Sequence, residues 1–162
     1  MTYILSIDPG LITGLSIGHF SYKDGYTLQK TWTRGFQELS DDLWNETIPY
    51  DNKTIKVIER FVPQSGANYT LKEDDLAGVE VIGMLKHALN LPEQINWRTR
   101  SQKSIAGSPE KSDQILKDHG LWQEGAMVDW HDGRDANDSI LHALGYLKDT
   151  NHMPTLRKYF KS

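Results

Sequence analysis

The chain contains no cysteine. This absence excludes disulfide bonds, thiolate zinc sites and cysteine nucleophiles, so a bound metal would have aspartate, glutamate or histidine ligands. The chain also lacks an apolar run close to the roughly 20 residues that span a bilayer, and its first residues do not form a basic segment with a cleavage site. We therefore expect neither a membrane helix nor secretion.

Positive charge is in short supply as well. Eighteen lysine and arginine residues stand against 22 aspartate and glutamate residues, which gives a net charge of −4. This balance argues mildly against nonspecific binding to polyanions but leaves local basic patches open. The length of 162 residues and the hydrophobic content of 38% predict one globular domain over residues 1–162.

The first third of the chain has the alternating pattern of strands. A β-rich run over residues 3–8 ends in Asp8 and a Pro-Gly turn, and alternation resumes over residues 14–20 and 26–33. Short connections between three successive strands predict an antiparallel meander. Asp8 then lies at the carboxyl end of the first strand.

The rest of the chain alternates between helical and strand patterns. Apolar residues at helical spacing predict a helix over 36–47, and the strand predicted over 55–59 ends in Glu59. A strand reached through a crossover helix is most simply parallel to the first, so Asp8 and Glu59 should share one edge of the sheet. Further predicted elements are a long helix containing Leu76 to Leu89, a weak strand over 95–97, a helix from Pro109 to Gly120, a last helix over 135–148 and a short basic tail over 157–161.

Two more carboxylates lie at the start of the last predicted helix. Asp135 and Asp138 are three residues apart, about 60° around the helix axis, so both can address one point. If this helix packs on the sheet edge, they meet Asp8 and Glu59. Each bare pair of carboxylates about 4 Å apart repels by on the order of 4 kcal/mol, which a divalent cation removes. Oxygen ligands favour Mg²⁺ or Mn²⁺, and a two-metal site is suited to phosphodiester hydrolysis.

Each of these acids, taken singly, also has a purely structural interpretation. Asp8 is compatible with a plain turn, Glu59 with a solvated strand end, and Asp135 and Asp138 with a helix cap. Their joint placement favours the cluster.

Short motifs follow one another in a specific order along the chain. They are Ile4 to Gly10 with Thr13-Gly14, Val57 to Glu59, Ala77 to Val79, Gly107 through Ser112, and Asp135 to Asp138. In this order they resemble the RuvC-like Holliday junction resolvases, over nearly the whole chain. The resemblance implies a ribonuclease H-like α/β fold, with a central mixed five-stranded sheet of three antiparallel and two parallel strands flanked by helices.

The resemblance also implies an activity. It implies a homodimer that nicks four-way DNA junctions with two Mg²⁺ or Mn²⁺ ions per active site, and Asp8, Glu59, Asp135 and Asp138 fill the catalytic and metal-binding positions. His131 is a further candidate contact to metal or attacking water, and its alternative is a surface loop histidine. A cytoplasmic location is expected, in a bacterium or, for a bacteriophage protein, in the infected host cell.

Candidate DNA contacts are basic or aromatic. Arg98, Arg100, Lys103 and Lys111 belong to the densest positive stretch and are predicted to contact phosphates. Phe61 lies where the family presents an aromatic residue that stacks on bases. The alternatives are a solvated charged surface for the basic residues and ordinary loop packing for Phe61.

Three other histidines lie in predicted helices and are expected to be structural or exposed. They are His87, His119 and His142.

Two rival functions remain open at this stage. On the same fold, the acids would equally serve a nuclease for flaps, forks or RNA–DNA hybrids, because they set the chemistry and not the substrate shape. The other rival is a noncatalytic nucleic-acid or nucleotide-binding module built on the turn after Asp8. Four ordered acids are unnecessary for such a binder.

Overall fold

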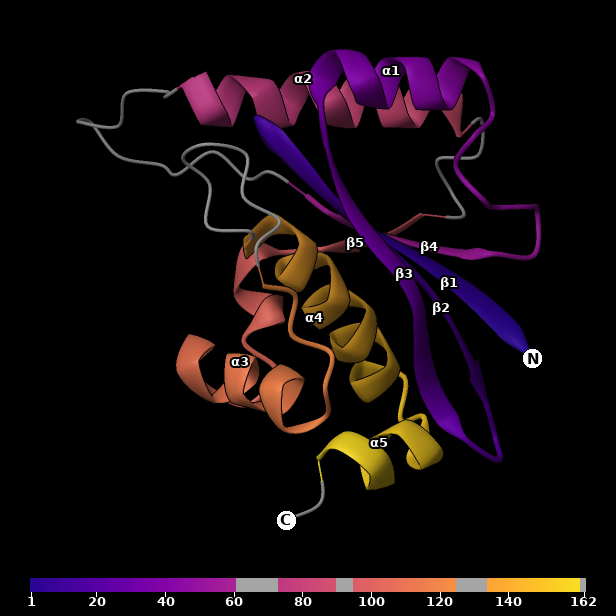
Figure 1. Ribbon diagram of the computed structural model, residues 1–162, viewed down its shortest axis with the longest axis vertical. Coiled ribbons are helices and arrows are strands. Elements are labelled where there is room, and N and C mark those ends of the chain that lie inside the picture. Colours follow the sequence, from indigo (N-terminus) through magenta and orange to yellow (C-terminus); the bar gives the residue numbers. More distant parts are fainter. Residues whose placement is uncertain (61–72, 90–94, 125–133, 161–162) are drawn as a thin grey trace.

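The structure is a computed structural model that describes residues 1–60, 73–89, 95–124 and 134–160. Its centre is a five-stranded sheet in the order β3-β2-β1-β4-β5 (Figure 1). The strands are β1 (Thr2–Asp8), β2 (Ile12–Ser21), β3 (Gly25–Gly35), β4 (Ile55–Glu59) and β5 (Ile95–Arg98). Pairing is antiparallel between β1, β2 and β3, and parallel between β1 and β4 and between β4 and β5. The predicted mixed sheet is confirmed.

Helices cover both faces of the sheet (Figure 1). They are α1 (Phe36–Trp44), α2 (Glu73–Ala88), α3 (Pro109–Asp118), α4 (Arg134–Asp149) and α5 (Met153–Tyr159), with a 3₁₀ helix, η2 (Arg100–Lys103). Helices α1 and α2 lie on one face, and α4 crosses the other face together with α3 and α5. No helix within the described ranges combines the length and apolar character needed to cross a bilayer.

The core has one apolar cluster on each face of the sheet. On the α1 and α2 face, buried residues include Leu5, Ile7, Ile58 and Leu85. On the α4 face they include Ile4, Val57, Ile140 and Leu144.

Strand alternation decides on which face the strand-end acids lie. Asp8 is four residues after Ile4, and Glu59 is two residues after Val57. Because every second side chain of a strand points to the same face, both acids project toward α4. The sheet therefore delivers Asp8 and Glu59 to the helix that carries Asp135 and Asp138.

The largest differences between predicted and observed elements are at the end of α1 and in the C-terminal tail. Helix α1 ends at Trp44 instead of residue 47, because Glu46 adopts a left-handed backbone with a φ of 54°. The predicted basic tail instead includes helix α5, with a proline in its first turn and with Thr155 and Tyr159 buried. The Tyr159 hydroxyl donates a 2.9 Å hydrogen bond to the Tyr26 carbonyl oxygen, which ties α5 to β3.

Candidate active site

The site begins where the N-terminal turn of α4 meets β2. Gly14, which pairs with Asp8 across the sheet, lies directly under the backbone of Asp135. A Cβ atom at Gly14 would overlap the Asp135 carbonyl oxygen. Only glycine allows this close approach, and it brings the first turn of α4 onto the strand end that carries Asp8.

Three side chains converge at this edge. Asp8, Glu59 and His142 each offer a potential metal-ligating atom, and these atoms all lie within 4.8 Å of one another. His142 is completely buried, and its Nε2 lies 2.8 Å from Oε2 of Glu59. The strand ends and α4 thus build one compact polar cluster inside a largely apolar interface.

Asp138 and Lys103 complete the cluster. Asp138 lies one helical turn before His142, and its Oδ2 accepts a short hydrogen bond from Nζ of Lys103. The same ammonium group lies 3.8 Å from Oε2 of Glu59. The lysine therefore neutralises part of the negative charge that the carboxylates bring together.

Asp135 acts on the cluster through its charge. Its carboxylate is one of the groups that raise the pKa of Asp8. The preceding Arg134 holds Asp113 of α3 at 3.1 Å and lies 3.9 Å from Oδ1 of Asp138. This first turn of α4 thus connects α3 to the acidic cluster.

The protonation behaviour of the cluster follows from burial and charge. Burial, and next the charge of Glu59, raise the pKa of Asp8 well above its ordinary value. Burial alone would also raise the pKa of Glu59, but the His142 hydrogen bond and the Lys103 charge hold it below its ordinary value. Burial opposes the charge of Lys103, yet the surrounding carboxylates, Asp8 first, raise its pKa. Asp8 is therefore the carboxyl group whose ionised form this site disfavours.

The donor set fits a divalent cation. Carboxylate oxygens with one imidazole suit Mg²⁺, Mn²⁺ and related ions, and no thiolate is available. Two buried atoms of the cluster, Oδ1 of Asp138 and Nδ1 of His142, have no hydrogen-bond partner among the described residues. Buried polar atoms of this kind normally have partners. The cluster thus has unused coordinating capacity as well as excess negative charge.

Comparison with known proteins bears on the fold. No protein-family model and no curated protein sequence matches the chain. Among solved structures, T. thermophilus RuvC in complex with a Holliday junction substrate aligns over 94% of this chain and 98% of its own, with a TM-score of 0.62 and 14% identity. The fold is RuvC-like. The Fowlpox virus Holliday junction resolvase, with substrate junction DNA and without, aligns over 92% and 91% of this chain and 99% of its own, each with a TM-score of 0.49 and 12% identity.

The RuvC-like fold matches the predicted ribonuclease H-like architecture. Asp8, Glu59 and Asp138 lie in one cluster, and their catalytic role stays a prediction. The histidine of the cluster was missed, because His142 was expected to be structural or exposed. Its spacing carried a usable signal: Asp138 and His142 are four residues apart, so they lie on the same face of a helix as successive turns.

The predicted DNA contacts fall into three groups. Arg98 is buried, with Nη1 2.5 Å from Oδ2 of Asp149 and Nη2 3.2 Å from the Gln102 carbonyl oxygen. In this arrangement it anchors β5 to α4, where Gly145 leaves room for its guanidinium. Lys103 points into the acidic cluster.

Arg100 and Lys111 form the second group, and both are exposed. Phe61 and His131 form the third, and they lie outside the described residues. Contact of any of these residues with DNA stays a prediction.

Proposed function

We propose that the protein is a divalent-metal-dependent endonuclease that nicks four-way DNA junctions. The observation that carries the proposal is the convergence of Asp8, Glu59 and Asp138 with His142 at the strand ends of a RuvC-like fold. Buried carboxylates with excess negative charge have little structural value, since apolar residues would pack the same space at lower cost. Metal-assisted phosphodiester hydrolysis explains why they are there.

Each residue has a role that follows from its contacts. Asp8, Glu59, Asp135 and Asp138 would hold Mg²⁺ or Mn²⁺, which when bound activates water and stabilises negative charge on the phosphate. His142 orients Glu59 through their 2.8 Å contact. The ammonium group of Lys103 lies against the same carboxylates. With those carboxylates neutralised by a bound cation, Lys103 would bind a phosphate oxygen of the DNA.

The substrate is proposed from the similarity to RuvC, and the assembly from the symmetry of a four-way junction. The RuvC to which this fold is similar is described in complex with a Holliday junction substrate. A four-way junction is close to two-fold symmetric, and one chain supplies one acidic cluster, so two symmetric nicks require two copies of the chain. We therefore propose a homodimer, and light scattering at the concentration used for cleavage should give twice the mass of the chain.

Cleavage of labelled four-way junctions, forks, flaps and linear duplex tests the function. The wild-type protein should nick junctions with Mg²⁺ or Mn²⁺ and stop in excess EDTA. Asp8→Asn and Asp138→Asn should lose at least about 10³-fold in rate while retaining junction binding, because each removes a metal ligand and one negative charge facing the phosphates. Asp118→Asn, which changes an exposed acid at the far end of α3, is the control.

Three outcomes would change the proposal. Wild-type rates in both cluster variants would make the acids structural and favour the binding module. Faster cleavage of forks or flaps than of junctions would support the proposed hydrolysis but assign the protein a different substrate. Undiminished cleavage in EDTA would show that the reaction does not require a divalent metal.

A further inference from the structure

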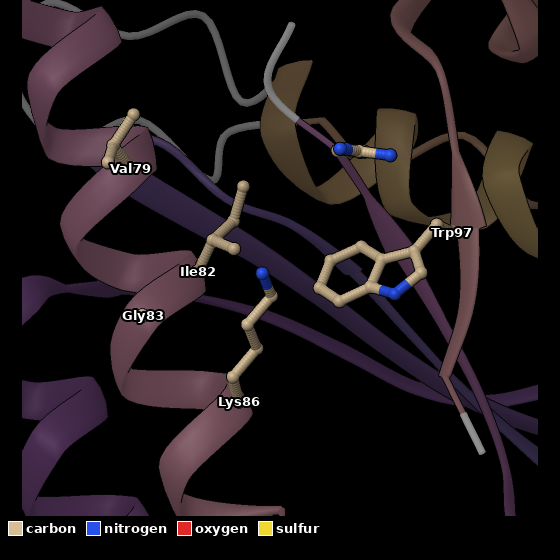
Figure 2. Close-up of a pocket in the computed structure, with 6 residues that line it drawn as sticks. Val79, Ile82, Gly83, Lys86 and Trp97 are labelled. Carbon is tan, nitrogen blue, oxygen red and sulfur yellow. The ribbon is translucent and has the colours of Figure 1, made fainter. Parts of the chain in front are cut away.

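A pocket of about 480 Å³ lies on the α2 side of the sheet edge. Its lining comes from α2, from β5 and from the residue that follows β4 (Figure 2): Arg60, Val79, Ile82, Gly83, Lys86 and Trp97. This volume is within the range of roughly 300–1,000 Å³ that is typical of small-ligand sites. The proposed catalytic cluster uses none of these residues.

Part of the pocket wall is apolar and aromatic, from Val79, Ile82 and Trp97. In Figure 2, Ile82 and Lys86 extend from α2 toward the indole of Trp97. Nζ of Lys86 lies 5.2 Å from the centre of the indole ring. At Gly83 no atom lies within 4 Å of the position that a Cβ would take, so the helix wall is open there. A flat group can therefore reach the indole past Gly83 when the Lys86 ammonium, which lies over the ring, turns toward an anion on that group.

The charge of the pocket is positive. Arg60 and Lys86 both line it, and neither has a carboxylate partner within ion-pairing distance among the residues the structure describes. An indole beside two available cations suits a ligand that is both aromatic and anionic. A nucleotide is such a ligand, since bases stack on aromatic side chains and phosphates bind lysine and arginine.

The pocket is adjacent in the chain to the acidic cluster. Arg60 directly follows Glu59, and consecutive Cα atoms are about 3.8 Å apart. Trp97 packs with the apolar cluster of the α2 face, whereas Glu59 projects toward α4. The strand ends thus separate an acidic site on one face from a basic pocket with an indole on the other.

We infer that this pocket binds one unstacked nucleotide of the DNA substrate, with its base against Trp97 and Ile82 and its phosphate between Arg60 and Lys86. The inference rests on the proposed function and adds a subsite to it. A second copy of the chain is a poorer occupant, because a two-fold interface here would bring like charges of the two copies together.

Binding in EDTA tests the subsite without cleavage. The probes are a fluorescein-labelled oligothymidylate and a labelled four-way junction, followed by anisotropy. Gly83→Leu fills the open wall with a better helix former and keeps both cations. It should weaken oligothymidylate binding about tenfold, the size of one lost stacking contact. Lys86→Ala should weaken it and flatten its salt dependence.

Lys30→Ala is the matched control. Nζ of Lys30 lies 4.9 Å from the centre of the Trp32 ring, on β3 at the opposite edge of the sheet. The variant removes the same charge from the same kind of indole contact and should leave binding unchanged. Circular dichroism of every variant checks the fold.

Photo-crosslinking gives a positive readout. Oligothymidylate in which 5-bromouracil replaces thymine should crosslink to Trp97 of the wild-type protein, and Gly83→Leu should suppress that product. Crosslinks confined to other peptides would overturn the subsite. So would unchanged affinity in both pocket variants, or loss of self-association in Gly83→Leu with DNA affinity retained, which would assign the pocket to a second copy. If the subsite results hold but the wild-type protein does not cut junctions with metal, the subsite stands and the proposed nuclease function fails.

Discussion

The two faces of one sheet edge handle charge in opposite ways. On the α4 face, Asp138 and His142 are buried and Lys103 lies among carboxylates. On the α2 face, Arg60 and Lys86 line an open pocket and have no carboxylate partner among the described residues. On the first face, charged groups are buried and paired with one another, at a cost in stability. On the second face, the cations lack carboxylate partners within the described part of the chain. The face of the sheet on which a basic side chain lies, and not its residue type, separates the ion-paired from the unpaired basic residues in this comparison.

Neighbouring arginines illustrate the same difference. Arg98 at the end of β5 is held by Asp149 and by the Gln102 backbone, whereas Arg60 after β4 lies against the pocket. The amide of Arg60 donates a 2.6 Å hydrogen bond to the Arg98 carbonyl oxygen. Two arginines whose backbones are hydrogen-bonded thus lie on opposite faces, one in an ion pair and the other lining a pocket.

The largest contrast between the faces is expected at two glycines. Gly14→Ala should destabilise the protein by roughly 3 kcal/mol or more, because the new methyl group overlaps the Asp135 backbone. Gly83→Ala, which meets open space on α2, should stabilise the protein by up to about 1 kcal/mol. Urea denaturation measures both. Equal effects would mean that the α4 face tolerates shifts as readily as the α2 face.

Arg98→Ala should have the next largest effect. It removes a buried guanidinium that joins β5 to Asp149 and to the Gln102 carbonyl oxygen, and should cost about 2 kcal/mol of stability. Arg100→Ala changes an exposed residue of η2 and should stay within about 0.5 kcal/mol. Thermal unfolding of the two variants, compared at one pH, checks the difference. A stable Arg98→Ala protein with weak DNA binding would assign Arg98 to the DNA surface after all.

Two lysines compare the faces directly. Lys103→Ala leaves the carboxylates of Glu59 and Asp138 without their counter-charge and should destabilise the metal-free protein by about 1–2 kcal/mol at neutral pH. Lys86→Ala should change stability by less than about 0.5 kcal/mol. Denaturation in EDTA measures the effect, and addition of Mn²⁺ should reduce the deficit of Lys103→Ala. An equal loss of stability in the two variants would contradict the distinction between buried, ion-paired lysine on one face and unpaired lysine on the other.

The smallest of these effects is expected at Asp8, and it depends on pH. A carboxyl group whose pKa is raised on folding favours the folded state only while it is protonated, so the contribution of Asp8 to stability falls as pH rises above its ordinary pKa of 3.8. In EDTA, Asp8→Asn should match the wild type near that pH and exceed its stability by on the order of 1 kcal/mol at pH 7.

Mg²⁺ provides the control for Asp8. It should raise the melting temperature of the wild-type protein by binding the folded state, and raise that of Asp8→Asn less. A difference in stability between the two proteins that stays constant across pH would contradict a raised pKa of Asp8 in the folded state.

The sequence predicted the architecture well because that information is local. Strand alternation and turn residues placed Asp8 and Glu59 at strand ends, and the parallel crossover then fixed their common edge. The inward position of Lys103 and the burial of Arg98 depend on partners 35 and 51 residues further along the chain, which no local pattern specifies. Helix α5 carried a proline signal that its basic composition obscured.

The contact between Gly14 and the start of α4 has a consequence for the geometry of the acidic cluster. Atoms of the backbone set this approach, and none of them gains or loses a proton. The contact that sets the distance between the strand end and the helix therefore does not itself depend on whether the acids are ionised. If the proposed nuclease function holds, the same backbone contact would position the acids both with Lys103 alone and with a metal ion bound.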